Sequence, residues 1–248
     1  MPKTAPRFNL RGRRVEWRAT TGSTMLVAAE LARAGCASGT VVVADEQTAG
    51  VGRHGRIWHS EPGAGLYVSI VLRLDLPAEK LPVTMLALGL ATREAIQQTS
   101  TLQPDLRWPN DVLLDGKKCA GILAQLDGSA LIAGIGINVS QKSFPEGLET
   151  PATSLALEGA TVSREDLLAA LAHAVDRYST MLSKEGPVVI ARLFTEASSY
   201  ANGRRVRAEA EGRRVEGVTS GLDPSGFLLI REDDGKIATV LAGGVRPA

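Results

Sequence analysis

Four stretches of the chain have the apolar spacing of amphipathic helices. The first, STMLVAAELARA, ends at Gly35, a common helix terminator, and Ser23 or Thr24 is placed to cap its start. In the third, Ser163 stands three residues before Asp166, which is a weak capping-box pattern. The predicted helices span residues 23–34, 81–98, 163–182 and 187–197.

Short apolar and β-branched runs between these helices predict strands. A polar, glycine-rich stretch at residues 45–65 separates the first two strands, whereas connections in compact domains usually span about 4 to 6 residues. Loops of this size are often functional, so this stretch is a candidate site. The segments PND and DGS are expected to form turns. The predicted strands span residues 40–44, 66–74, 106–108, 119–126 and 131–139.

The pattern changes at residue 202, where short alternating runs begin between Gly, Asp and Pro turns. These runs predict a small all-β module, because the helical spacing stops at Ala201 and turn residues follow at once. We therefore expect two domains, residues 1–201 and residues 202–248.

The charge balance and the cysteine content exclude several classes of function. The 28 Lys and Arg residues are balanced by 27 Asp and Glu residues, so no global positive field favours a polyanion such as DNA. The basic stretch at residues 7–18 is expected to be a solvated or weakly ordered terminal arm, with a nucleic-acid-binding arm as the alternative, and we assign it no function. Cys36 and Cys119 form no CxxC pair, which argues against a disulfide framework or zinc cluster. No signal peptide or membrane span is evident, so we expect a cytoplasmic protein that binds neither DNA nor membranes.

The most informative segment is QTAGVGRHGRIW, in which Gly50, Gly52 and Gly55 alternate with Arg53 and Arg56. Glycines allow successive backbone N–H groups to face one anion, and arginine adds a fork of donors suited to phosphate or carboxylate. The segment is neither a Walker loop nor a good Rossmann fingerprint. It predicts an anion-binding loop, and the alternative is a flexible loop with solvated arginines.

Further candidates follow this loop. Trp58 ends it, where an indole could stack on a base, although a lone tryptophan is more often a core residue. In RWPNDVLLDGKKCAGIL, Asp111 offers a carboxylate suited to Mg²⁺, and Lys118 could hold the opposite side of a phosphate. The alternative is that Asn110 and Asp111 form an ordinary turn and that the lysines are solvated.

Taken together, these segments resemble the biotin protein ligases. The chain contains Ser23-Thr24, QTAGVGRHGRIW, WPND, KCAGIL and GIGIN, in the order of that family's motifs. The resemblance is strong over residues 20–139 and extends to the end of the chain. It implies an α/β fold, with a class II aminoacyl-tRNA synthetase-like catalytic domain built on a mixed sheet, followed by a small SH3-like β-barrel. About twenty residues before Thr20 are too few for a helix-turn-helix, so we expect the monofunctional class without a DNA-binding domain.

The resemblance also implies a reaction. Biotin and MgATP would form biotinyl-5′-AMP, and a lysine of a biotin carboxyl carrier protein would then attack this mixed anhydride. Two anions must meet, so cationic groups have to offset their charge. The resemblance assigns this task to Arg53, Arg56 and Lys118, and it makes Asp111 the magnesium ligand. The chain would use ATP, Mg²⁺ and biotin, and it could act as a homodimer.

The binding roles that the resemblance implies fall into two groups. Biotin is expected to contact Ser23, Thr24, Gln47, Gly50, Val51, Gly52, Arg53, Lys118, Gly121 and Leu123. The adenylate is expected to contact Arg53, Arg56, Trp58, Asn110, Lys118 and Asn138.

The chain departs from the family pattern at three positions. Val51 replaces a usual arginine, Met25 replaces a common asparagine, and Arg107 replaces a usual lysine. Val51 leaves open a biotin sensor or a degenerate ligase with weak turnover. The nearest alternative enzyme is a lipoate or octanoate ligase. RNA binding by the β module is a more remote alternative function. His54 and His59 lack a third ligand at metal spacing and are expected to be exposed loop residues.

Overall fold

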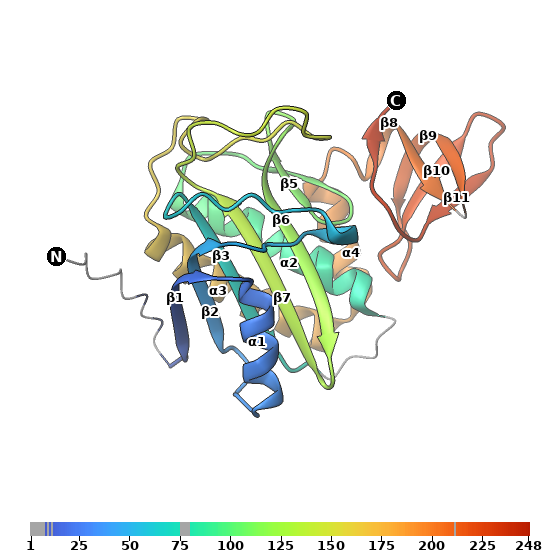
Figure 1. Cartoon of the computed structure of the whole chain (residues 1–248). Coiled ribbons are helices and arrows are strands. Elements are labelled where there is room, and N and C mark those ends of the chain that lie inside the picture. The colour runs from blue at the N-terminus through green and yellow to red at the C-terminus, as the bar shows by residue number, and fades with distance from the viewer. Residues whose placement is uncertain (1–7, 9, 11, 75–79, 211) are drawn as a thin grey trace.

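The computed structural model describes residues 8, 10, 12–74, 80–210 and 212–248. Its main body is built on a seven-stranded sheet in the order β1-β2-β3-β7-β6-β5-β4 (Figure 1). β1 pairs with β2 in parallel and the other neighbours pair antiparallel, so the sheet is mixed. The strands are β1 (Val15–Thr21), β2 (Val41–Gln47), β3 (Gly65–Leu72), β4 (Asp105–Arg107), β5 (Asp111–Leu114), β6 (Lys117–Asp127) and β7 (Ala130–Asn138).

All four predicted helices are confirmed. Ser23 caps the first, since its hydroxyl accepts a hydrogen bond from the Met25 N–H at 3.3 Å. Ser163 likewise accepts from the Asp166 N–H at 3.2 Å. None of the described helices is both long and apolar enough to cross a membrane. The helices are α1 (Thr24–Arg33), α2 (Leu81–Thr99), α3 (Arg164–Glu185) and α4 (Pro187–Ala197).

The helices cover opposite faces of the sheet. α1 lies on one face, where Ala28 and Ala32 pack against Val42 of β2 and Val71 of β3. The residues that alternate with these point to the other face and pack in one core with α2, α3 and α4 (Figure 1). β3 is therefore buried along its whole length, and its sequence GLYVSIVL is apolar at nearly every position.

The predicted β module is an antiparallel sheet of five strands in the order β11-β10-β9-β8-β12. Its apolar residues join the main core, and the Trp108 indole N–H donates to the Gly226 carbonyl at 2.9 Å. The C-terminal sheet is therefore packed against the main body beside α2 and α4. The strands are β8 (Asn202–Ala210), β9 (Arg213–Leu222), β10 (Leu228–Glu232), β11 (Ile237–Val240) and β12 (Arg246–Pro247).

Two expectations about secondary structure were wrong. Val15 to Arg18 belong to edge strand β1 and not to a solvated arm, because their backbone pairs with β2. Residues 7, 9 and 11 of that predicted arm lie outside the described residues. Asp111 opens strand β5 instead of lying in a turn, and the turn ends at Asn110. In both places pairing with a neighbouring strand determines the extended backbone conformation. The polar residues of these segments did not predict that conformation.

Candidate functional site

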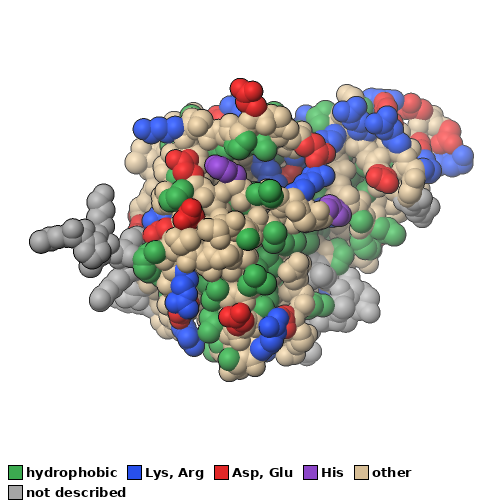
Figure 2. Space-filling view, in the orientation of Figure 1, with side chains coloured by type: hydrophobic (Ala, Val, Ile, Leu, Met, Phe, Trp, Pro, Cys, Tyr) green, Lys and Arg blue, Asp and Glu red, His purple; other side chains and the backbone are tan. Residues whose placement is uncertain are grey.

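A cavity of about 880 Å³ opens between the long loop, strands β6 and β7, and the C-terminal sheet. This volume falls within the roughly 300–1,000 Å³ usual for small-molecule sites. Figure 2 shows Lys and Arg side chains inside this hollow face of the molecule. Of the expected site residues, Gly50 alone is absent from the described lining. The lining includes Ser23, Thr24, Gln47, Val51, Gly52, Arg53, Arg56, Trp58, Asn110, Asp111, Lys118, Gly121, Leu123 and Asn138.

The glycine-arginine loop is a short hairpin over the cavity. The Gly52 N–H donates to the Arg56 carbonyl at 2.7 Å, and the Trp58 N–H donates to the Gly50 carbonyl at 2.8 Å. A Cβ at Gly50 would lie 3.0 Å from the Trp58 carbonyl oxygen, which explains the glycine there. The Gly52 amide is thus used within the loop, and the expected backbone cradle for an anion is not formed there. The cationic side chains remain to bind an anion.

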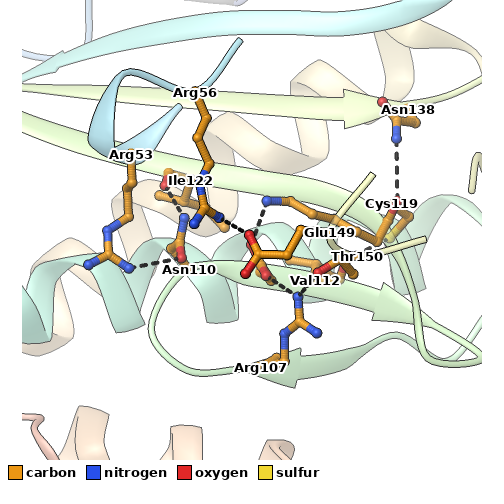
Figure 3. Close-up of polar contacts among 12 residues, drawn as sticks. Arg53, Arg56, Arg107, Asn110, Val112, Cys119, Ile122, Asn138, Glu149 and Thr150 are labelled. Atoms are coloured by element: carbon orange, nitrogen blue, oxygen red, sulfur yellow. Dashed lines mark hydrogen bonds and ion pairs between the residues drawn. The ribbon is translucent and has the colours of Figure 1, made fainter. Parts of the chain in front are cut away.

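Both loop arginines reach partners outside the loop (Figure 3). Arg53 Nη1 donates to the Gly243 carbonyl at 2.6 Å and to Asn110 Oδ1 at 3.3 Å. Asn110 is itself held by β6, because its side-chain amide donates to the Ile122 carbonyl at 3.0 Å. Burial lowers the pKa of Arg53, although nearby Asp111 opposes this shift. Arg53 is therefore a cation held at the junction of the two sheets.

Lys118 belongs to a buried charge triad. Its Nζ lies 2.5 Å from Asp111 Oδ1, and Arg107 Nη2 lies 2.5 Å from Asp111 Oδ2. Burial alone would raise the pKa of Asp111, but Lys118 and Arg107 together outweigh burial and lower it. Arg107 also donates to the Thr150 hydroxyl at 2.8 Å. The triad carries one net positive charge and presents Lys118 to the cavity.

Trp58 lies on a shelf made of two glycines. Gly121 of β6 and Gly136 of β7 are paired across the sheet, and a Cβ on either would lie within 2.8 Å of the indole ring. Lys118 Nζ lies 5.5 Å from the ring centroid, a cation–π distance. The indole N–H is buried and has no hydrogen-bond partner among the described residues. The glycines leave room for a flat group, here the indole, against the backbone. Gly136 was not predicted as a site residue, because the sequence does not show which face of β7 it lies on.

The inner end of the cavity is polar. The Thr24 hydroxyl and backbone N–H both donate to Gln47 Oε1, at 3.0 and 2.8 Å. The Thr24 hydroxyl also lies 2.8 Å from the Ser69 hydroxyl, which is fully buried. Sequence reasoning missed Ser69, although a single serine within the apolar run LYVSIVL was a usable signal. Ser23 lines the cavity while capping α1, so its hydroxyl already has a structural partner.

Asn138 is buried at the end of β7. Its side-chain amide donates to the Thr153 carbonyl at 2.9 Å and approaches the Lys118 carbonyl at 3.4 Å. Gln141 Nε2 donates to Asn138 Oδ1 at 3.5 Å. The amide therefore links the segment that follows β7 to β6, and Figure 3 shows it directed across to the backbone of β6 beside Cys119.

Glu149 and Arg246 are charged residues of the lining that sequence reasoning missed. Glu149 forms ion pairs with Arg56 at 2.6 Å and with Arg246 of β12 at 2.8 Å. Burial works against ionisation of Glu149, but Arg246, Arg56 and Arg107 lower its pKa. Neither residue lies in a recognisable motif, so only the fold could bring them together. His54 and His59 are exposed as expected, and no cluster of three metal-binding side chains occurs among the described residues.

Comparison with known proteins is consistent across the chain. Residues 12–141 match the Biotin/lipoate A/B protein ligase family, and residues 202–245 match the Biotin protein ligase C terminal domain. The bifunctional ligase/repressor BirA of Bacillus spizizenii is 34% identical over 92% of this chain and 74% of its own. The biotin–[acetyl-CoA-carboxylase] ligase of Mycobacterium tuberculosis is 35% identical over 92% of this chain and 86% of its own.

A solved structure agrees with these relatives. The biotin protein ligase from Aquifex aeolicus in complex with biotin and ATP superposes with a TM-score of 0.83 at 31% identity. The match covers 95% of this chain and 99% of that one. The segments that form both sheets, except β12, and all five sequence motifs thus lie within matches to one family. The chain belongs to the biotin protein ligase family.

Proposed function

We propose that this protein is a biotin protein ligase, which forms biotinyl-5′-AMP from biotin and ATP and then transfers biotin to a lysine of a biotin carboxyl carrier protein. The observation that carries this proposal is one cavity in which the cationic side chains of Arg53, Arg56 and Lys118 lie between a polar end and a glycine shelf. Biotin and ATP are both anionic where they react, so a site that joins them must supply positive charge.

The cavity suits the two substrates at different ends. Thr24 and Gln47 offer hydroxyl and amide groups at the buried end, which fit the polar ureido ring of biotin. The shelf of Gly121 and Gly136 fits a flat group, and Trp58 can stack on the adenine after leaving or shifting along that shelf. The reacting carboxylate and α-phosphate then lie near Lys118, between the two ends.

The residues promote adenylate formation by position and charge. Lys118 is held by Asp111, so it needs little reorganisation to face the carboxylate oxygen that attacks the α-phosphate and displaces pyrophosphate. Arg53 is held by Gly243 and Asn110 and can turn its free donors to the phosphate. Closure of the loop over both ligands would exclude water, which would otherwise hydrolyse the anhydride. The acceptor lysine then attacks the activated carbonyl carbon and AMP leaves.

The geometry does not fit Asp111 as a direct magnesium ligand. Both of its carboxylate oxygens already face cations at 2.5 Å, and only 9% of the residue is exposed. Mg²⁺ prefers oxygen ligands that are free to coordinate it. We therefore assign Mg²⁺ to the MgATP substrate and assign Asp111 the task of positioning Lys118.

The proposal also covers the domain architecture, the cellular location, the acceptor and the oligomeric state of the protein. We infer a synthetase-like catalytic domain at residues 1–201 and an SH3-like barrel at residues 202–248, supported by the two family matches and the two sheets. We infer that the enzyme acts in the cytoplasm, and the acceptor is expected to be a subunit of a biotin-dependent carboxylase. A homodimer stays a prediction, which sedimentation of the purified protein with and without biotin tests.

Mass spectrometry of an acceptor domain tests the proposed function. A biotin carboxyl carrier domain incubated with the protein, biotin and MgATP should gain one biotin-sized mass. Reactions without ATP, or with lipoate or octanoate in place of biotin, should leave the mass unchanged. Pyrophosphate release without acceptor labelling would instead indicate a degenerate ligase, and biotin binding without pyrophosphate release would indicate a sensor.

A further inference from the structure

Glu149 joins three parts of the chain that are far apart in sequence. Its Oε2 lies 2.6 Å from Arg56 of the glycine-arginine loop, and its Oε1 lies 2.8 Å from Arg246 of β12. Each carboxylate oxygen thus has its own guanidinium partner, and all three residues line the cavity. One carboxylate links the loop, the segment after β7 and the C-terminal sheet.

The backbone that carries Glu149 is firmly placed although its side chain is 55% exposed. The neighbouring Thr150 accepts a hydrogen bond from Arg107, a member of the buried triad. Two residues further on, the segment pairs with β6, because the Lys118 N–H donates to the Pro151 carbonyl at 2.7 Å. Glu149 therefore stands at a fixed distance from the cation that faces the reacting groups.

Arg56 is held more loosely than Arg53. Its side chain is 61% exposed, and its pair with Glu149 is an exposed ion pair of the kind that contributes little stability. A polyphosphate carries more negative charge than one carboxylate and offers several oxygens to a guanidinium. It can therefore take Arg56 from Glu149, while Arg246 stays behind as the remaining partner of the carboxylate.

We propose that Glu149 is a positioning residue that holds Arg56 over the empty site and releases it to the phosphates of the nucleotide. This inference rests on the proposed function and adds to it a competition between a protein carboxylate and the substrate for one arginine. Glu149 acts through Arg56 in this proposal. Its removal should leave Arg56 free and raise the positive charge of the site, so nucleotide should bind more tightly and the empty loop should open more often.

The test compares Glu149→Gln with Glu146→Gln in the full-length protein. Glu146 is exposed in the same segment and has no ion pair within the described part of the chain, so it controls for the change of charge. In the pyrophosphate assay, Glu149→Gln should lower the KM for ATP by about two- to fivefold, the range of an exposed ion pair, and leave the KM for biotin unchanged. Glu146→Gln should change neither KM.

Two readouts do not depend on ligase activity. Calorimetry should show the same fall in the Kd for ATP alone, and trypsin without ligands should cleave after Arg56 faster in Glu149→Gln than in the wild type or the control. An unchanged or higher KM or Kd for ATP in Glu149→Gln, or equal cleavage of all three proteins, would overturn the proposal. Because these binding and cleavage measurements need no acceptor, they remain informative if the labelling experiment fails.

Discussion

Asp111 offers the sharpest test of how the site is built. Its carboxylate lies between Lys118 and Arg107, each at 2.5 Å, and Arg107 is only 3% exposed. Replacing Asp111 with Asn keeps the shape of the side chain but removes its charge. Arg107 would then be a buried cation that keeps a hydrogen bond to the Thr150 hydroxyl, the Tyr200 ring at 5.9 Å and the electrostatic influence of Glu149.

The expected loss in the free energy of unfolding is large. Removing one partner of a buried ion pair usually lowers the free energy of unfolding by about 3–5 kcal/mol, because the other charge stays uncompensated. The pair of Arg33 with Asp127 provides a matched control, since it also joins an arginine to an aspartate but has an Arg33 side chain that is 64% exposed. Asp127→Asn should lower the free energy of unfolding far less, because solvent screens an exposed ion pair.

Urea denaturation of the full-length variants measures both losses, through the transition midpoint and slope. A loss for Asp111→Asn no larger than that for Asp127→Asn would refute the role of Asp111 as a buried counter-charge. Acid adds a second check. The pKa of Asp111 is lowered on folding, so its stabilisation is complete above the ordinary value of 3.8 and is lost as the pH falls through the lower folded-state pKa. The difference in stability between wild type and Asp111→Asn should therefore shrink below pH 3.8.

Three further substitutions test the cavity. Lys118→Ala should slow adenylate formation by about 10² or more, because a preorganised cation is lost, and near-normal pyrophosphate release would contradict that role. Trp58→Ala should weaken ATP binding by about 1–3 kcal/mol and biotin binding less, as calorimetry can measure; unchanged ATP affinity would make Trp58 a packing residue. Gly136→Ala places a methyl group 2.5 Å from the indole ring, so Trp58 must leave the shelf and its fluorescence should shift to longer wavelength, whereas an emission equal to wild type would count against the shelf.

Local patterns predicted much of the fold. The four helices, the serine caps of α1 and α3, and most long strands followed from periodicity and capping residues, which act within a few positions along the chain. Strands β1 and β5 were not predicted, since VEWRATT and DVLL owe their extended backbone to pairing with β2 and β6. Strand propensity depends on such neighbours far more than helix propensity does.

The site was predicted in its residues more than in its contacts. Arg53, Arg56 and Lys118 do face one cavity, but the expected metal ligand Asp111 proved to be the partner of Lys118. The Gly52 amide was expected to face an anion and instead closes a hairpin. In each case the residue type was informative, whereas its hydrogen-bond partner depended on geometry.

The sequence by itself determined the family, the order of the motifs and the chemistry that the loop can offer, because these depend on residue types and short spacings. Only the tertiary structure decided which charges meet. Glu149 and Arg246 are 97 positions apart by their residue numbers and belong to no motif, yet they share an ion pair beside Arg56. Pairing of β6 with the segment after β7 and packing of the C-terminal module against the main body bring these side chains within contact distance, and no local pattern contains that information.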